Sequence, residues 1–212
     1  MNVLIVGGFL GSGKTSLIEQ IARYIANRRK ESAHTEVVII ENEIGDISID
    51  GQYLKTTGIK VENLFAGCAC CTLSGETADA LNRLKKEVNP QWVILELSGV
   101  AVPDNIIRII KKMQIVTRTC IIVDGNRWER IRIPLEKLLQ DQLQGADIVL
   151  LNKTDLIKDE EIKAVECSVI SKSRHVMIRP TSLLTTLDDE LIEEILGKGG
   201  GYESTQKPCI DV

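Results

Sequence analysis

The feature that most constrains the fold of this chain is the octapeptide Gly8-Phe9-Leu10-Gly11-Ser12-Gly13-Lys14-Thr15. It fits the pattern G-x-x-x-x-G-K-[ST] at every fixed position, with the apolar run 2–6 before it and the amphipathic run 16–29 after it. Glycines let the backbone turn tightly, so that successive amides and the N-terminus of the next helix face an anion. The sequence therefore predicts a strand, a phosphate-binding loop and a helix in this order.

Short apolar runs alternate with amphipathic stretches along the rest of the chain. The predicted strands are 2–6, 36–40, 92–96, 117–123, 147–151 and 175–179, and the predicted helices are 14–30, 75–88, 103–113, 134–144, 159–172 and 187–196. Repeated strand–helix units form right-handed crossovers and a mostly parallel sheet. The predicted fold class is therefore α/β, a three-layer P-loop NTPase fold with a helix-flanked sheet.

Two segments depart from this alternation. The runs Gln52–Lys55 and Ile59–Leu64 are separated by a polar Thr-Thr-Gly turn, which predicts a small hairpin. The glycine-rich and polar stretch 199–212 predicts a flexible tail after one domain over residues 1–198.

Composition and charge exclude several classes of partner. The 212 residues are 43% hydrophobic and 26% charged, with a net charge of −4, which does not favour a nucleic-acid or anionic-membrane surface. No apolar run approaches the roughly 20 residues that cross a bilayer, and the N-terminus lacks the basic region of a signal peptide. We therefore expect a cytoplasmic protein that binds neither nucleic acid nor membrane.

The phosphate loop supplies the first candidate site residues. We expect Lys14 to contact the β- and γ-phosphates and the hydroxyl group of Thr15 to ligate Mg²⁺. The other residues expected to contact the nucleotide here are Gly8, Gly11, Ser12, Gly13 and Ser16.

Acidic residues follow two of the predicted strands. Glu96 ends the run 92–96 and is a candidate catalytic residue near Mg²⁺ or its water, while the Gly99 amide could meet a γ-phosphate; the alternative is a polar strand terminus. Glu41 and Glu43 follow the second strand in a loop that is either metal-adjacent or simply a solvated acidic turn. Together with Lys14, Glu96 and Glu43 are the catalytic candidates.

The tetrapeptide Asn152-Lys153-Thr154-Asp155 follows the strand 147–151 and matches N-K-x-D. At this position the Asp155 carboxylate can accept hydrogen bonds from the ring N–H and exocyclic amine of guanine, a donor pair that adenine lacks. Lys153 would pack its stem over the purine. The pattern favours GTP over ATP; the alternative is a polar loop that caps the following helix.

Three cysteines occur within Gly67-Cys68-Ala69-Cys70-Cys71. Thiolates bind Zn²⁺ and other late first-row cations strongly, and three local ligands leave a site open to water, Glu41, Glu43, His175 or a partner chain. A redox thiol pair and plain buried cysteines are the alternatives. Cys120, within an apolar run, is predicted to be a small buried side chain.

With these motifs in place, the chain resembles the metal-insertion class of P-loop GTPases and, within it, the CobW-like metallochaperones. The C-x-C-C element separates this group from the hydrogenase, urease and methylmalonyl-CoA mutase accessory relatives. The matching elements occur in family order up to about residue 196: Gly8–Thr15, Glu41-Asn42-Glu43-x-Gly45…Asp50, Gly67-Cys68-x-Cys70-Cys71, Glu96-x-Ser98-Gly99…Pro103 and Asn152–Asp155.

The resemblance implies weak GTP hydrolysis and a zinc or cobalt ion near Cys68, Cys70 and Cys71. Among the candidates for a further ligand, we expect Glu41. It also implies nucleotide-dependent transfer to a client metalloprotein or corrinoid-related protein, with a homodimer as one option. The segment 181–183 is the nearest counterpart of the family's second base-contacting loop, which makes Ser182 a candidate.

Family members typically carry a further C-terminal domain, often with a histidine-rich segment. We therefore expect this chain to be truncated to the GTPase domain. The motifs contain no arginine that would act as a finger, so slow turnover is expected until a partner docks. A regulatory GTPase switch with a structural zinc, and a P-loop small-molecule kinase, are the two competing interpretations.

Overall fold

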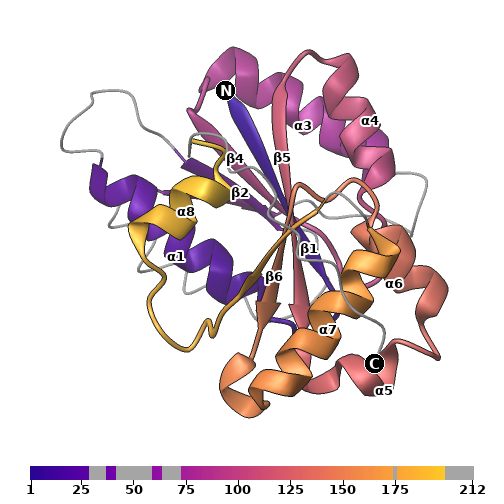
Figure 1. Ribbon diagram of the computed structural model, residues 1–212. Helices are drawn as coiled ribbons and strands as arrows, with labels where there is room; N and C mark the ends of the chain where they lie inside the picture. The colour runs from indigo at the N-terminus through magenta and orange to yellow at the C-terminus, as the bar shows by residue number, and fades with distance from the viewer. Residues whose placement is uncertain (29–36, 42–58, 64–72, 174–175, 199–212) are drawn as a thin grey trace.

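The computed structural model describes residues 1–28, 37–41, 59–63, 73–173 and 176–198 (Figure 1). Within these ranges seven strands form one sheet in the order β3-β2-β4-β1-β5-β6-β7, with all neighbouring pairs parallel. The strands are β1 (Asn2–Gly8), β2 (Val37–Glu41), β3 (Lys60–Asn63), β4 (Trp92–Glu96), β5 (Val116–Asp124), β6 (Ile148–Asn152) and β7 (Met177–Pro180). The predicted α/β class is confirmed.

Helices cover both faces of the sheet (Figure 1). Helices α1 and α8 pack on one face, whereas α3 and α4 cover one half of the other face and α5, α6 and α7 cover its second half. The helices are α1 (Lys14–Asn27), α3 (Leu73–Glu87), α4 (Asp104–Lys112), α5 (Trp128–Ile131), α6 (Glu136–Leu143), α7 (Asp159–Lys172) and α8 (Asp189–Ile195), with short 3-10 turns at Gly125–Arg127 and Thr154–Leu156.

The two-residue period of the strands divides the core between these faces. In β1, Leu4 and Val6 pack with α1 and α8, while Val3 and Ile5 pack with α3 and α4. All four side chains are fully buried, because a parallel sheet covered on both faces leaves no strand face in water. This explains why β2, β4 and β6 are apolar up to their last residue and why they were predictable.

The six predicted strands and six predicted helices are present, with ends shifted by a few residues. The expected hairpin is only partly described. Its second run forms β3, which joins the main sheet parallel to β2 with Lys60 opposite Val38. Its first run, 52–55, lies outside the described residues, as does the predicted tail over 199–212. A short strand's own side-chain pattern does not specify its partner, so the sequence predicted this extended run but not its parallel pairing with β2 in the main sheet.

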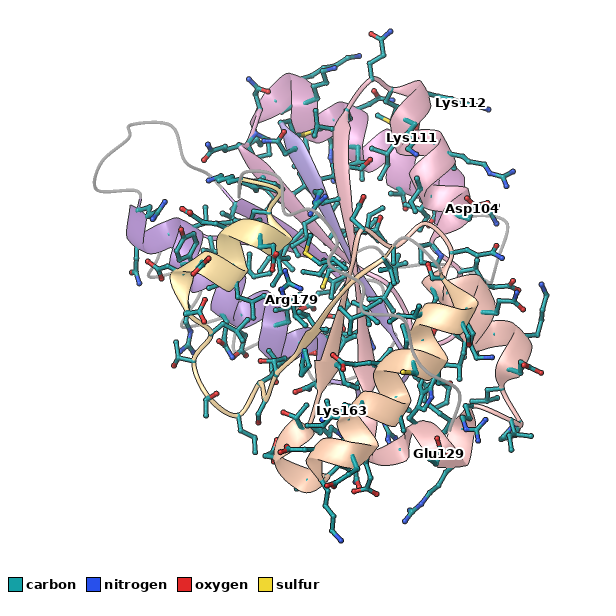
Figure 2. All side chains as sticks on the ribbon, in the orientation of Figure 1. Asp104, Lys111, Lys112, Glu129, Lys163 and Arg179 are labelled. Carbon is teal, nitrogen blue, oxygen red and sulfur yellow. The ribbon has the colours of Figure 1, made fainter. Side chains whose placement is uncertain are left out.

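The carboxyl ends of the parallel strands lie at one edge of the sheet, and this edge carries the loops that follow β1, β4, β5 and β6. Charged side chains such as Lys111, Lys112 and Lys163 are exposed on the outer faces of α4 and α7, whereas Arg179 lies between the sheet and α8 (Figure 2). The Arg179 Nε donates a 2.8 Å hydrogen bond to Glu194 of α8, which attaches this last helix to β7.

Among the described residues, no helix has the length and apolar character needed to cross a membrane.

Candidate nucleotide-binding site

The phosphate loop connects β1 to α1 and is closed by a short turn. The Ser12 N–H donates to the carbonyl oxygen of Phe9 at 3.0 Å, and α1 begins at Lys14 directly after the loop. Gly13 has a φ of +113°, and a Cβ atom there would lie 2.4 Å from Nδ2 of Asn152. Only glycine fits both the backbone conformation and this contact.

Lys14 and Glu96 form a buried ion pair at the base of the loop. Their Nζ and Oε1 atoms are 3.9 Å apart, and both residues are 5% exposed. The pair forms because β1 and β4 are neighbours with Val6 opposite Glu96, so that the end of β4 faces the loop that follows β1. At this separation the carboxylate orients the ammonium group electrostatically rather than through a short hydrogen bond.

The segment after β4 packs directly against the phosphate loop. A Cβ atom at Gly99 would lie 2.8 Å from the backbone nitrogen of Leu10, so the two segments approach as closely as a glycine permits. Gln142 of α6 donates from Nε2 to the carbonyl oxygens of Gly99 and Ala101 at 3.0 and 3.2 Å. The predicted γ-phosphate segment is therefore held beside the loop tip.

The N-K-x-D motif lies on the other side of the phosphate loop. Asn152 ends β6, and its buried Nδ2 donates to the Ser12 carbonyl at 2.7 Å while its Oδ1 accepts from the Leu183 N–H at 2.9 Å. The Ser182 hydroxyl donates to Oδ1 of Asp155 at 2.5 Å. The structure thus brings together Asp155 and Ser182, which were proposed from separate parts of the sequence.

Gln20 on α1 also holds the segment after β7, and the sequence did not indicate this role. Its Nε2 donates to the carbonyl oxygens of Leu183 and Thr185 at 3.3 and 3.2 Å, and its Oε1 accepts from the Leu187 N–H at 2.8 Å. The helix that begins at the phosphate loop therefore fixes the loop that carries Ser182.

Two further residues were missed, Asp124 at the end of β5 and Arg127 in the turn that follows. Asp124 is 1% exposed, and Arg127 donates from Nη2 to the carbonyl oxygen of Leu10 at 2.5 Å. An arginine therefore lies against the phosphate loop although none stands within the motifs. The available signal was an acidic residue that closes an apolar strand, the same signal that identified Glu96.

The predicted transition-metal site is mostly outside the described residues. Glu41 is half-buried at the end of β2, whereas Glu43, Cys68, Cys70 and Cys71 are not among the residues described. In the described part of the chain, no group of three or more histidine, cysteine, aspartate or glutamate residues could hold a metal ion.

Cys120 is fully buried in β5, as predicted. Burial raises the pKa of its thiol well above the ordinary value, so this side chain stays protonated and behaves as a small apolar group.

Comparison with known proteins gives a consistent result. Residues 2–178 match the family described as CobW/HypB/UreG, nucleotide-binding domain. A protein named zinc chaperone CobW from Sinorhizobium sp is 29% identical over 94% of this chain and 63% of its own length. The zinc chaperone YjiA of Escherichia coli (strain K12) is 30% identical over 75% of this chain and 51% of its own length. The chain thus spans about half to two thirds of such relatives.

Solved structures share the fold. The hydrogenase maturation factor HypB from Archaeoglobus fulgidus has a TM-score of 0.62 at 20% identity, covering 93% of this chain and 89% of that one. A Zn(II)-bound triple mutant of YjiA GTPase has a TM-score of 0.65 at 20% identity, covering 100% and 68% respectively. From the family match and the shared fold, this chain belongs to the CobW/HypB/UreG family of nucleotide-binding domains.

Proposed function

We propose that this chain binds and slowly hydrolyses GTP, and that the nucleotide state controls how it binds zinc and hands it to a client protein. The observation that carries the nucleotide half is the convergence of three elements at one sheet edge. These are the phosphate loop, the Lys14–Glu96 pair, and the Asp155–Ser182 contact, which Asn152 joins to the loop.

Each element has a distinct role in the proposal. Lys14 and the loop amides stabilise the charge that develops on the β,γ-bridging oxygen, which is the main work in phosphoryl transfer. The Ser182 hydroxyl orients the Asp155 carboxylate, whose remaining lone pairs accept the two guanine N–H donors. Adenine would leave that carboxylate without its partners.

The donor set at the loop fits Mg²⁺. Thr15 supplies a hydroxyl oxygen directly after Lys14, and the nearby Glu96 supplies a carboxylate, either directly or through water. Oxygen ligands of this kind, together with phosphate oxygens, are those that Mg²⁺ takes in nucleotide sites. Bound Mg²⁺ would neutralise charge on the β- and γ-phosphates.

The metal half of the proposal rests on the sequence motif and the names of relatives. Cys68, Cys70 and Cys71, with Glu41, offer soft ligands and an incomplete local set, which suits a transferable ion. Relatives named zinc chaperone favour zinc over cobalt as the cargo. Thiolate ligation releases protons, so binding strengthens as pH rises.

Base selectivity tests the nucleotide half. We expect Asp155→Asn to weaken GTP binding about 100-fold and to restore tight binding to XTP, because an amide can donate to the xanthine oxygen that replaces the guanine amine. Lys14→Ala should lower GTP hydrolysis at least about 100-fold. If Asp155→Asn bound GTP as tightly as wild type does, and bound XTP no more tightly than wild type does, guanine recognition by this residue would be refuted.

Zinc transfer to a fluorescent chelator tests the metal half. Zinc-loaded protein should release its ion faster once its GTP has been hydrolysed to GDP than while it holds a non-hydrolysable GTP analogue. One ion per chain that is retained throughout nucleotide exchange would instead support a structural zinc in a regulatory switch. GTP consumption that requires a small-molecule acceptor and releases no phosphate would support a kinase.

A further inference from the structure

Asp124 connects the N-K-x-D motif at residues 152–155, here called the base motif, to the phosphate loop through one buried carboxylate. Its Oδ2 atom accepts from Nε of Arg127 at 2.6 Å and from Nζ of Lys153 at 2.7 Å, while Oδ1 accepts from the Arg127 backbone N–H at 3.2 Å. The Asp124 side chain is fully buried, whereas those of Arg127 and Lys153 are about one-third exposed.

The two cations lead to different parts of the site. The Arg127 side chain extends from Asp124 to the tip of the phosphate loop, residues 9–12. There it donates to the Leu10 carbonyl, and its guanidinium carbon lies 5.9 Å from the centre of the Phe9 ring. Lys153 stands between Asn152 and Asp155 with a left-handed φ of 66°. One oxygen atom is therefore shared by Arg127, which contacts the phosphate loop, and Lys153, which belongs to the N-K-x-D motif.

We propose that Asp124 is a positioning residue that couples occupancy of the base site to the order of the phosphate-loop tip. This inference rests on the proposed packing of the Lys153 stem over guanine. When the stem is fixed by the purine, the ammonium group holds the Asp124 carboxylate in place, and the carboxylate in turn holds Arg127 on the Leu10 carbonyl. Two cations around one anion also leave net positive charge beside the loop, where polyphosphate would bind.

Asp124→Asn keeps the shape but removes the charge that both cations share. Two cations that face each other without a carboxylate repel, and the geometry of Arg127 is then no longer fixed. We expect GDP affinity to fall about tenfold. Arg132→Gln is the matched control, because Arg132 forms an exposed pair with Glu129 on the same segment and has no contact with the loop in the described residues.

A double-mutant cycle tests the coupling directly. Arg127→Met and Lys153→Met each keep an apolar stem and remove the charge. In the wild-type background the effects of the two substitutions on the Kd of GDP should be non-additive by about fivefold. In the Asp124→Asn background, the two substitutions together should change the Kd of GDP by the product of their separate effects. Additive effects in the wild-type background would overturn the proposal, even if Asp124→Asn fails to fold.

Hydrogen–deuterium exchange with guanosine, which has no phosphate, separates coupling from simple stability. Guanosine should slow exchange of the amides of residues 9–12 in wild type but not in Arg127→Met or Asp124→Asn. If guanosine binds and this exchange is unchanged, the coupling is wrong while guanine recognition stands. If guanosine does not compete with GDP in wild type, the proposed base site itself fails, and the coupling fails with it.

Discussion

The side-chain amide of Asn152 donates a 2.7 Å hydrogen bond to the carbonyl oxygen of Ser12, which joins the end of β6 to the phosphate loop. The same amide accepts from the backbone of Leu183 and so also fixes the segment that carries Ser182. Both bonds are buried. If the Asn152 amide were removed, the Ser12 carbonyl and the Leu183 N–H would each lose a hydrogen bond without gaining one to water. One side chain therefore holds both the phosphate loop and the segment that carries Ser182.

Asn152→Asp provides a nearly isosteric test of this arrangement. The carboxylate still accepts from Leu183, but its second oxygen faces the Ser12 carbonyl and repels it. We expect GDP affinity to fall at least about tenfold, with a lower melting temperature, since a buried unpaired polar group costs about 1–3 kcal/mol. Calorimetric titration with GDP measures the first effect. An unchanged Kd would show that the bond to Ser12 has no role in binding.

Gly13→Ala should abolish nucleotide binding. Its φ of +113° is unfavourable for any residue with a Cβ atom, and that atom would lie 2.4 Å from Asn152. Gly75→Ala is the matched control, because nothing lies within 4 Å of a Cβ at this helical position. The control should bind GDP normally and gain about 0.5–1 kcal/mol in free energy of unfolding. Similar GDP binding by the two variants would contradict the described loop geometry.

Gln20→Glu tests whether α1 fixes the segment after β7, which carries Ser182. The variant keeps the acceptor for Leu187 but loses the donors to the carbonyls of Leu183 and Thr185. We expect about tenfold weaker GDP binding, while kcat at saturating GTP changes little because Gln20 lies away from the phosphates. Glu19→Gln on the neighbouring, half-exposed position is the control. A fall in kcat with an unchanged Kd would refute this role.

Tyr24 should make stability depend on pH in the alkaline range. Burial, followed by the hydrogen bond that the hydroxyl donates to Glu193 at 2.8 Å, raises the pKa of Tyr24 from 10.0 to about 12. The folded protein therefore keeps this proton more tightly than the unfolded chain. The resulting stabilisation is complete below pH 10 and is lost as pH rises toward 12.

Tyr24→Phe isolates this effect from the titration of lysines. Denaturant unfolding at several pH values should show that the stability difference between wild type and Tyr24→Phe is constant from neutral pH to pH 10, where Glu193 stays ionised, and shrinks above pH 10. A difference that stays constant to pH 12 would mean that the Tyr24 proton is held equally in both states.

The elements of the fold were predictable because their signals are local. Apolar strands followed by a glycine loop, by Glu96 or by Asn152 reveal where the sheet edge lies, and the parallel arrangement then brings those ends together. Asp124 carried the same signal, but its use depends on Arg127 and Lys153, which no motif links to it.

The rest depends on contacts between segments that are distant in the sequence. Arg127 and Leu10 are 117 positions apart, and Gln20 and Thr185 are 165 apart. No local pattern in α1 distinguishes Gln20 from another half-exposed helical residue. The pairing of β3 with β2 likewise depends on tertiary contacts, which the sequence of a four-residue strand does not reveal.

The central claim is that the nucleotide state sets zinc affinity, and competition with a zinc chelator measures this directly. Zinc should bind at least about fivefold more tightly to protein saturated with a non-hydrolysable GTP analogue than to protein saturated with GDP. The double variant Cys70→Ser, Cys71→Ser should lose tight binding in both states. Equal zinc affinity of the wild-type protein in the two nucleotide states would contradict the account.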